Sequence, residues 1–231
     1  MRPTGPRWAR SNQSDVDPVG RSSSYDRRVR PDPQVTVTHV GPIIRVERHE
    51  FASTLAPDGT QRPPLVRDVV RHPGAVTVIA VRNDGILVLV RNRRIAVAQW
   101  LVEFCAGKLE RGEDPADAAR RELEEETGYA AGRIERLGSF FTSPGFTDEI
   151  MHVFLATDLA QVPQRLEPGE ELEVVAMSRA ELARAIALGE ITDGKTLGAF
   201  LLWTLMPQAV AESDRLAPTI GNATSVGEAR V

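Results

Sequence analysis

Short runs of β-branched and other apolar residues, separated by turn residues, recur along most of the chain. Such runs predict β-strands, and they occupy residues 35–38, 43–46, 65–70, 75–81, 86–90, 101–104, 134–141, 150–156 and 172–177. The run at 75–81 is rich in β-branched residues throughout, which is typical of a strand buried on both faces. Asn83-Asp84-Gly85 follows it and indicates a hairpin turn to the next run.

Three segments have helical patterns instead. Residues 115–127 follow an aspartate suited to an N-cap, begin with a proline and precede a glycine, which together bound a helix. Ser178 and Glu181 form a capping box for a second helix. A third helix is expected from about Asp193 to Met206, with one apolar face. The order of strands and helices predicts an α/β fold, with a mixed sheet flanked by helices.

The two ends of the chain lack these patterns. Residues 1–33 are rich in Arg, Ser, Pro and Asp and contain too few large apolar groups to offset the entropy of ordering. We therefore expect a disordered tail at 1–33, an N-terminal antiparallel strand region at 34–70, a main domain at 71–211 and a flexible C-terminal tail at 212–231.

Composition narrows the class of protein. The chain has 231 residues, 42% of them hydrophobic, which is enough for one sizeable domain with tails. Its formal net charge of −4 gives no broad basic surface, so we expect neither nucleic acid nor an anionic membrane as a partner. No apolar run approaches the roughly 20 residues of a membrane span. Cys105 is the single cysteine, which rules out an intramolecular disulfide and fits the reducing cytoplasm.

Candidate chemistry concentrates on the first predicted helix. Glu122, Glu125 and Glu126 are spaced i, i+3 and i+4, which places three carboxylates on one helical face. Like charges at this spacing cost about 0.2–0.5 kcal/mol per pair, so a compensating cation is expected. Clustered carboxylate oxygens suit Mg²⁺ or Mn²⁺, which keep water ligands for a phosphate substrate. For the three glutamates alone, however, a solvated acidic face balanced by Arg120 and Arg121 is the better explanation.

The wider segment 107–129, GKLERGEDPADAARRELEEETGY, changes that balance because it resembles the Nudix box. The polar and glycine positions of the box are filled by Gly107, Glu113, Arg121, Glu122, Glu125, Glu126 and Gly128. At average residue usage, agreement at seven fixed positions has a chance probability of about 10⁻⁸ per window. The resemblance implies a Nudix α/β/α sandwich that hydrolyses a nucleoside diphosphate linked to another group.

The resemblance also implies roles for individual residues. Mg²⁺, with Mn²⁺ as the alternative, is expected on Glu122, Glu125, Glu126 and the backbone carbonyl of Ala106. Structural roles are expected for Gly107, Glu113, Arg121 and Gly128, with Glu113 and Arg121 orienting the ligands through salt bridges.

The segments around the box resemble the ADP-ribose pyrophosphatase branch of this family, from about residue 34 to residue 206. Arg94 stands at the substrate-binding arginine of the branch, although Asn92 and Arg93 replace its usual Gln and Tyr. Residues 103–107, EFCAG, and 143–149, SPGFTDE, match two further segments, with Cys105 in place of the usual proline. The expected substrate contacts are Arg94, Glu103, Arg67, Pro144 and Phe146.

Simpler explanations compete for several of these contacts. From composition alone, Arg94 is as well explained as a solvated surface arginine as it is as a residue that binds pyrophosphate. Glu103 is more informative, because a charge on an apolar strand is costly unless Arg94 or ribose hydroxyls pair with it. Arg67 reaches a substrate only across a dimer, and a solvated strand face explains it better.

The branch carries its general base on a mobile loop after the box. Residues 167–173, EPGEELE, occupy that place, and the register against the following strand selects Glu170, with Glu171 second. An acidic surface loop is the competing explanation for both. Glu126 is the third residue for which we expect a direct catalytic role.

The implied reaction converts ADP-ribose to AMP and ribose 5-phosphate, in a homodimer that exchanges its N-terminal strands. GDP-mannose, UDP-glucose and NADH are the alternative substrates, because related branches share several of the flanking residues. A sensor that binds ADP-ribose without catalysis is a further alternative. Such domains usually lose box acids, and this chain keeps all of them.

Overall fold

The computed structural model describes residues 32–56, 58–166 and 169–216, with side chains as far as residue 205. The elements in chain order are β1 (Gln34–Val40), β2 (Arg45–Phe51), β3 (Thr54–Leu55), β4 (Gln61–Arg62), β5 (Leu65–Arg71), β6 (Ala75–Val81), β7 (Leu87–Arg94), η2 (Ile95–Val97), β8 (Gln99–Glu103), β9 (Cys105–Lys108), α1 (Pro115–Thr127), β10 (Tyr129–Phe141), β11 (Ile150–Gln161), β12 (Leu172–Met177), α2 (Arg179–Ala187) and α3 (Gly194–Leu216). Within this part of the chain, no helix has the length and apolar character needed to cross a membrane.

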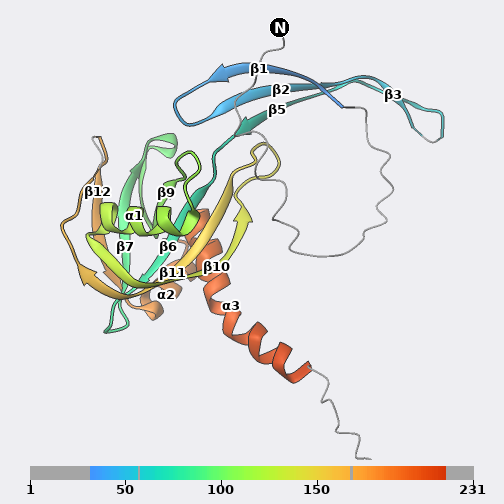
Figure 1. Cartoon of the computed structure of the whole chain (residues 1–231). Helices are drawn as coiled ribbons and strands as arrows, with labels where there is room; N and C mark the ends of the chain where they lie inside the picture. Colours follow the sequence, from blue (N-terminus) through green and yellow to red (C-terminus); the bar gives the residue numbers. More distant parts are fainter. Residues whose placement is uncertain (1–31, 57, 167–168, 217–231) are drawn as a thin grey trace, which may run out of the picture.

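A seven-stranded mixed sheet forms the centre of the protein (Figure 1). Its strand order is β10-β11-β6-β7-β12, with β8 paired to β7 and β9 paired to β6. β11 and β6 run parallel, whereas the other pairs are antiparallel. β6 is buried from Ala75 to Ala80, as its run rich in β-branched residues predicts.

Helices cover both faces of this sheet, so the expected α/β/α sandwich is confirmed. Successive residues of β6 point to opposite faces, and Val76 and Val78 pack with Leu123 of α1. Ile79 packs instead with Leu182 of α2 and with residues of α3. The sheet therefore has one core beneath α1 and a second core beneath α2 and α3.

Local signals position the helices. Asp114 caps α1 by accepting the Ala116 N–H at 2.8 Å, and Gly128 ends the helix with a left-handed φ of 69°. The capping box at Ser178 and Glu181 starts α2. α3 continues to Leu216, beyond the end expected near Met206. The expected boundary at residue 212 therefore falls within a helix.

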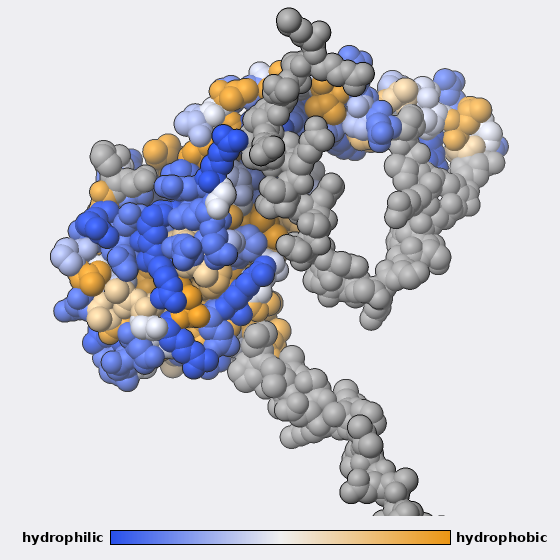
Figure 2. Space-filling view, in the orientation of Figure 1, coloured by the Kyte–Doolittle hydropathy of each residue, from blue (hydrophilic) through white to orange (hydrophobic). Residues whose placement is uncertain are grey.

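A separate three-stranded antiparallel sheet, β1-β2-β5, precedes the central sheet and lies to one side of it (Figure 1). Figure 2 shows apolar surface on this N-terminal sheet, where Val35 and Val37 are each 48% exposed and Val40 is 72% exposed. The expected tails lie outside the described residues, apart from residues 32–33 at one end and 212–216 at the other.

A buried ion-pair cluster ties the N-terminal sheet to the loop after β10. Glu47, which is only 6% exposed, pairs with Arg45, His49 and Arg71. Burial alone would raise the pKa of Glu47, but hydrogen bonds from Arg71 and His49 outweigh burial and lower it. Arg71 also pairs with Asp148 at 3.0 Å, so one guanidinium connects the two regions.

Candidate active site

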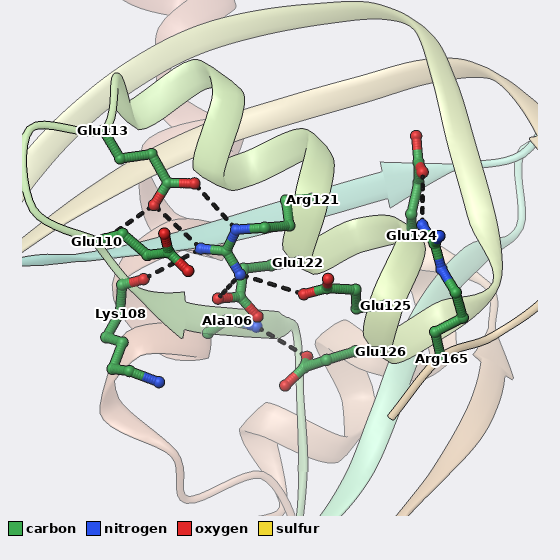
Figure 3. Close-up of polar contacts among 10 residues, drawn as sticks. All are labelled: Ala106, Lys108, Glu110, Glu113, Arg121, Glu122, Glu124, Glu125, Glu126 and Arg165. Atoms are coloured by element: carbon green, nitrogen blue, oxygen red, sulfur yellow. Dashed lines mark hydrogen bonds and ion pairs between the residues drawn. The ribbon is translucent and has the colours of Figure 1, made fainter. Parts of the chain in front are cut away.

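The carboxylates of α1 form the centre of the candidate site. Glu122 and Glu126 are 9% and 4% exposed, and Glu125 is half-buried. Figure 3 shows the three side chains extending from α1 near β9, which carries Ala106. A solvated helix face would leave these groups in water, so their burial favours a built site over the competing explanation.

Arg121 holds the acidic residues around a single guanidinium (Figure 3). Its Nε and Nη2 donate to the two carboxylate oxygens of Glu113, at 2.9 and 3.1 Å, in a bidentate pair. Its Nη1 donates to Glu122 at 2.7 Å and to Glu125 at 3.1 Å. The hydrogen bonds from Arg121 lower the pKa of Glu113. The structural role expected for this pair agrees with these contacts and stays a prediction.

The backbone of β9 closes the site from the opposite side. A side chain on Gly107 would overlap the Glu122 carboxyl group, so only glycine lets β9 approach this closely. The Ala106 N–H donates to Glu126 Oε2 at 3.1 Å. Pairing of Ala106 with Thr77 on β6 fixes the position of this peptide. Ala106 therefore adjoins Glu126, and the metal contact expected of its carbonyl stays a prediction.

Burial raises the pKa values of the two inner carboxylates, Glu122 and Glu126. The pKa of Glu126 is raised to about 8, chiefly by burial, with the nearby charges of Glu122 and Glu170 acting in the same direction and the Ala106 hydrogen bond and the Arg94 charge opposing it. Burial also raises the pKa of Glu122. An ionised pair of this kind is costly without a cation, because little water solvates the charges.

The donor set fits a hard divalent cation, although a finished metal shell is not formed. Among the residues that the structure describes, no three acidic, histidine or cysteine side chains converge as a complete site. Arg121 Nη1 instead occupies the space between Glu122 and Glu125. Carboxylate and carbonyl oxygens are nevertheless the ligands that Mg²⁺ and Mn²⁺ prefer, and a cation would favour the ionised forms.

A second ion-pair cluster lies on the neighbouring strands. Glu103 is fully buried and pairs with Arg94 at 2.6 Å, so the arginine partner expected for it is present. Lys195, at the start of α3, also contacts Glu103 and pairs with Asp193 at 2.8 Å. Sequence reasoning missed Lys195, because its partner is 92 residues away and no local pattern joins them. Burial raises the pKa of Glu126, and the charge of Arg94 opposes this effect.

The two candidate bases have different surroundings. Glu171 pairs with Arg93 at 3.7 Å, and its carbonyl accepts the Arg93 N–H at 3.4 Å. After the larger effect of burial, the charge of Glu170 contributes to the raised pKa of Glu126. These contacts favour Glu170 over Glu171, and the choice stays a prediction.

The remaining expected substrate contacts lie at the periphery. Pro144 and Phe146 are exposed on the loop between β10 and β11, and the Phe146 carbonyl accepts the Val70 N–H at 2.7 Å. Arg67 lies on β5 in the N-terminal sheet, where its guanidinium donates to Val66 O at 2.9 Å. β5 belongs to the N-terminal sheet, whereas α1 packs on the central sheet (Figure 1).

Known proteins are similar to this chain in sequence. Residues 71–197 match the NUDIX domain. An ADP-ribose pyrophosphatase of Bacillus subtilis is 43% identical over 132 residues, which are 56% of this chain and 71% of that protein. A methanol dehydrogenase activator of Bacillus methanolicus is 44% identical over 133 residues, which are 57% and 72% of the two chains.

More distant relatives carry other names. A GDP-mannose pyrophosphatase of Citrobacter koseri is 34% identical over 149 residues, which cover 56% of this chain and 76% of that protein. The solved structure of an ADP compounds hydrolase superposes with a TM-score of 0.63 at 20% identity, over 82% of this chain and 100% of that one. At that identity, the superposition establishes the fold alone.

Proposed function

Because the chain belongs to the Nudix hydrolase family, we propose that it hydrolyses the pyrophosphate bond of ADP-ribose, releasing AMP and ribose 5-phosphate. The membership confirms the family and the enzyme class expected from residues 107–129. The observation that carries the substrate-cleaving role is the burial of Glu122 and Glu126 on the helix of a complete box. A sensor without catalysis would not need to retain every box acid.

We assign the divalent cation, Mg²⁺ with Mn²⁺ as the alternative, to Glu122, Glu125, Glu126 and the carbonyl of Ala106. When bound, the cation would neutralise charge on the non-bridging phosphate oxygens and lower the pKa of the attacking water. Arg121 orients two of the carboxylates through its contacts at 2.7 and 3.1 Å, while Glu113 holds the guanidinium in place.

Glu170 is the proposed general base, with Glu171 the second candidate, and Glu126 is the third residue proposed to act in catalysis. In the reaction, water forms a new P–O bond, the bridging P–O bond breaks, and the base accepts the proton of the water. The leaving phosphate oxygen keeps the electron pair of the broken bond. The ion pair of Glu171 with Arg93 supports the choice of Glu170.

The Arg94–Glu103 pair is the proposed anchor for the substrate. Arg94 is partly exposed and carries the charge that a pyrophosphate requires, while Glu103, which is fully buried, pairs with its guanidinium instead of facing the ribose hydroxyls. Pro144 and Phe146 would line the entrance from their exposed loop.

A homodimer is the proposed assembly. The exposed valines of the N-terminal sheet would become buried against a second copy, which would also let Arg67 reach the partner's substrate. Analytical ultracentrifugation should give twice the mass of one chain.

The cytoplasm stays our expected compartment, because Cys105 is a free and buried thiol.

A substrate panel tests the proposed function. We would measure kcat/KM for ADP-ribose, GDP-mannose, UDP-glucose and NADH, each with Mg²⁺ and with Mn²⁺. The proposal predicts the highest value for ADP-ribose, with AMP and ribose 5-phosphate as products. A higher value for GDP-mannose would support the alternative that the 34% identical relative favours. Tight binding of ADP-ribose without turnover would instead indicate a sensor.

A further inference from the structure

The segment of residues 162–166, which we call the clasp, joins the end of β11 to the loop that carries Glu170. It lies against the C-terminal end of α1, where three of its hydrogen bonds are to backbone carbonyls. The Val162 N–H donates to Gly128 O at 2.9 Å, and the Arg165 N–H donates to Glu125 O at 3.0 Å. Between them, Gln164 Nε2 donates to Glu126 O at 2.6 Å.

These contacts supply hydrogen-bond donors to backbone carbonyls at the end of the helix. The last carbonyls of an α-helix have no partner within the helix, and here they belong to Glu125 and Glu126, two of the residues assigned to the cation. The clasp therefore binds the backbone of the very turn that presents those carboxylates. It also continues directly into the loop that ends at Glu170 and Glu171.

Gly128 makes the close approach feasible. A Cβ at this position would lie 3.0 Å from Val162 O and 3.4 Å from the Gln164 Cβ, tighter than most side-chain contacts allow. Gly128 also has a φ of 69°, which disfavours other residues. The glycine that ends the box thus serves the clasp as well as the helix.

We propose that Gln164 is a positioning residue, whose amide fixes the loop that carries Glu170 relative to the Glu126 turn of α1. This inference rests on the proposed role of Glu170 as the base. The two backbone donors of the clasp remain in any variant, whereas the Gln164 amide is the one side-chain donor among the three bonds. Its removal would let the loop move while the rest of the fold stays in place.

The first experiment compares Gln164→Ala with a matched control, Arg165→Ala. The Arg165 side chain is 68% exposed and, among the residues that the structure describes, reaches only Glu124, at 3.5 Å (Figure 3), so its loss leaves the clasp bonds intact. With ADP-ribose and saturating Mg²⁺, Gln164→Ala should lower kcat about three- to tenfold, the range of one ordinary net hydrogen bond. KM and the Mg²⁺ midpoint should stay within about twofold. Arg165→Ala should match the wild type.

A second variant, Gln164→Glu, guards against a simple packing effect. It keeps the size of the side chain but, once ionised, offers no donor to Glu126 O. The inference predicts a loss of kcat at least as large as that of Gln164→Ala. Wild-type turnover in either variant, or an equal loss in Arg165→Ala, would overturn the positioning role.

A double-mutant cycle separates this inference from the proposed base. Glu170→Gln alone tests the base, and wild-type turnover in that variant would reject both the base and the role of Gln164 toward it. If Glu170→Gln is impaired, Gln164→Ala should cause no further loss in that background, because the group that it positions has been removed. Full multiplication of the two losses would show that Gln164 acts elsewhere, while leaving the base assignment intact.

Discussion

At the residue scale, the closest packing in the site is between Gly107 and Glu122. The backbone of β9 approaches the Glu122 carboxyl group so closely that no Cβ fits between them. The requirement for glycine at the first box position is thus steric, and it acts through a residue that is distant from Gly107 in sequence but adjacent in space. Motif recognition finds the residue, and only the structure gives the reason.

Gly107→Ala should therefore displace the Glu122 side chain and lower kcat with ADP-ribose at least about tenfold, since a displaced group loses its transition-state contacts. The fold should survive, because the displaced group is the end of a flexible side chain. Gly194→Ala is the matched control, because a Cβ there meets nothing within 4 Å. Equal turnover for Gly107→Ala and the control would contradict the close approach of β9.

The raised pKa of Glu126 predicts how the stability of the folded protein depends on pH. Its pKa is about 8 in the folded protein against 4.5 for an ordinary glutamate, so the folded state binds the proton more tightly. The stabilisation is therefore complete below about pH 4.5 and is lost as the pH rises toward 8. In the presence of EDTA, the free energy of unfolding should fall with a slope of up to about 1.4 kcal/mol per pH unit from this group.

Urea denaturation at several pH values measures that slope. Glu126→Gln, which removes the titrating group, should flatten it. Mg²⁺ should stabilise the wild type more at pH 8 than at pH 6, because it binds the ionised carboxylate. Identical pH profiles for the wild type and Glu126→Gln would show that Glu126 does not carry the effect.

At the element scale, α3 packs unusually closely on β10. A Cβ at Gly198 would lie 2.9 Å from the ring of Phe140, so the helix can approach the strand only because this residue is glycine. Gly198→Ala would gain about 1 kcal/mol on an exposed helix. Here we expect a net loss of about 1–3 kcal/mol from overpacking, seen as a lower midpoint in thermal unfolding. A raised midpoint would contradict this packing.

The elements that sequence patterns predicted are those with strong local signals. α1 and α2 were predicted from their caps, and β6 from its run rich in β-branched residues. β3, β4 and β9 were missed, because two to four residues carry too little periodicity. β9 also contains Gly107, which strand patterns disfavour, and its pairing with β6 depends on contacts distant in sequence.

At the scale of the whole molecule, the site combines one local motif with contacts that no local pattern reveals. The box supplies Glu122 and Glu126 within a single helix, as the sequence predicts, and their role as metal ligands stays a prediction. Lys195 reaches Glu103 from the start of α3. Arg71 on β5 pairs with Glu47 on β2 and with Asp148 between β10 and β11. Such partners depend on the tertiary fold, so they could not be predicted from spacing.

The account as a whole depends on carboxylates of α1 that bind a divalent cation for pyrophosphate cleavage. The most direct test is AMP release from ADP-ribose with Mg²⁺ by Glu126→Gln, compared with Glu124→Gln. Glu124 lies on the same helix but pairs only with exposed Arg165, at 3.5 Å. The account predicts that Glu126→Gln loses at least about a hundredfold in kcat while remaining folded, and that Glu124→Gln keeps wild-type turnover. Wild-type turnover by Glu126→Gln would contradict it.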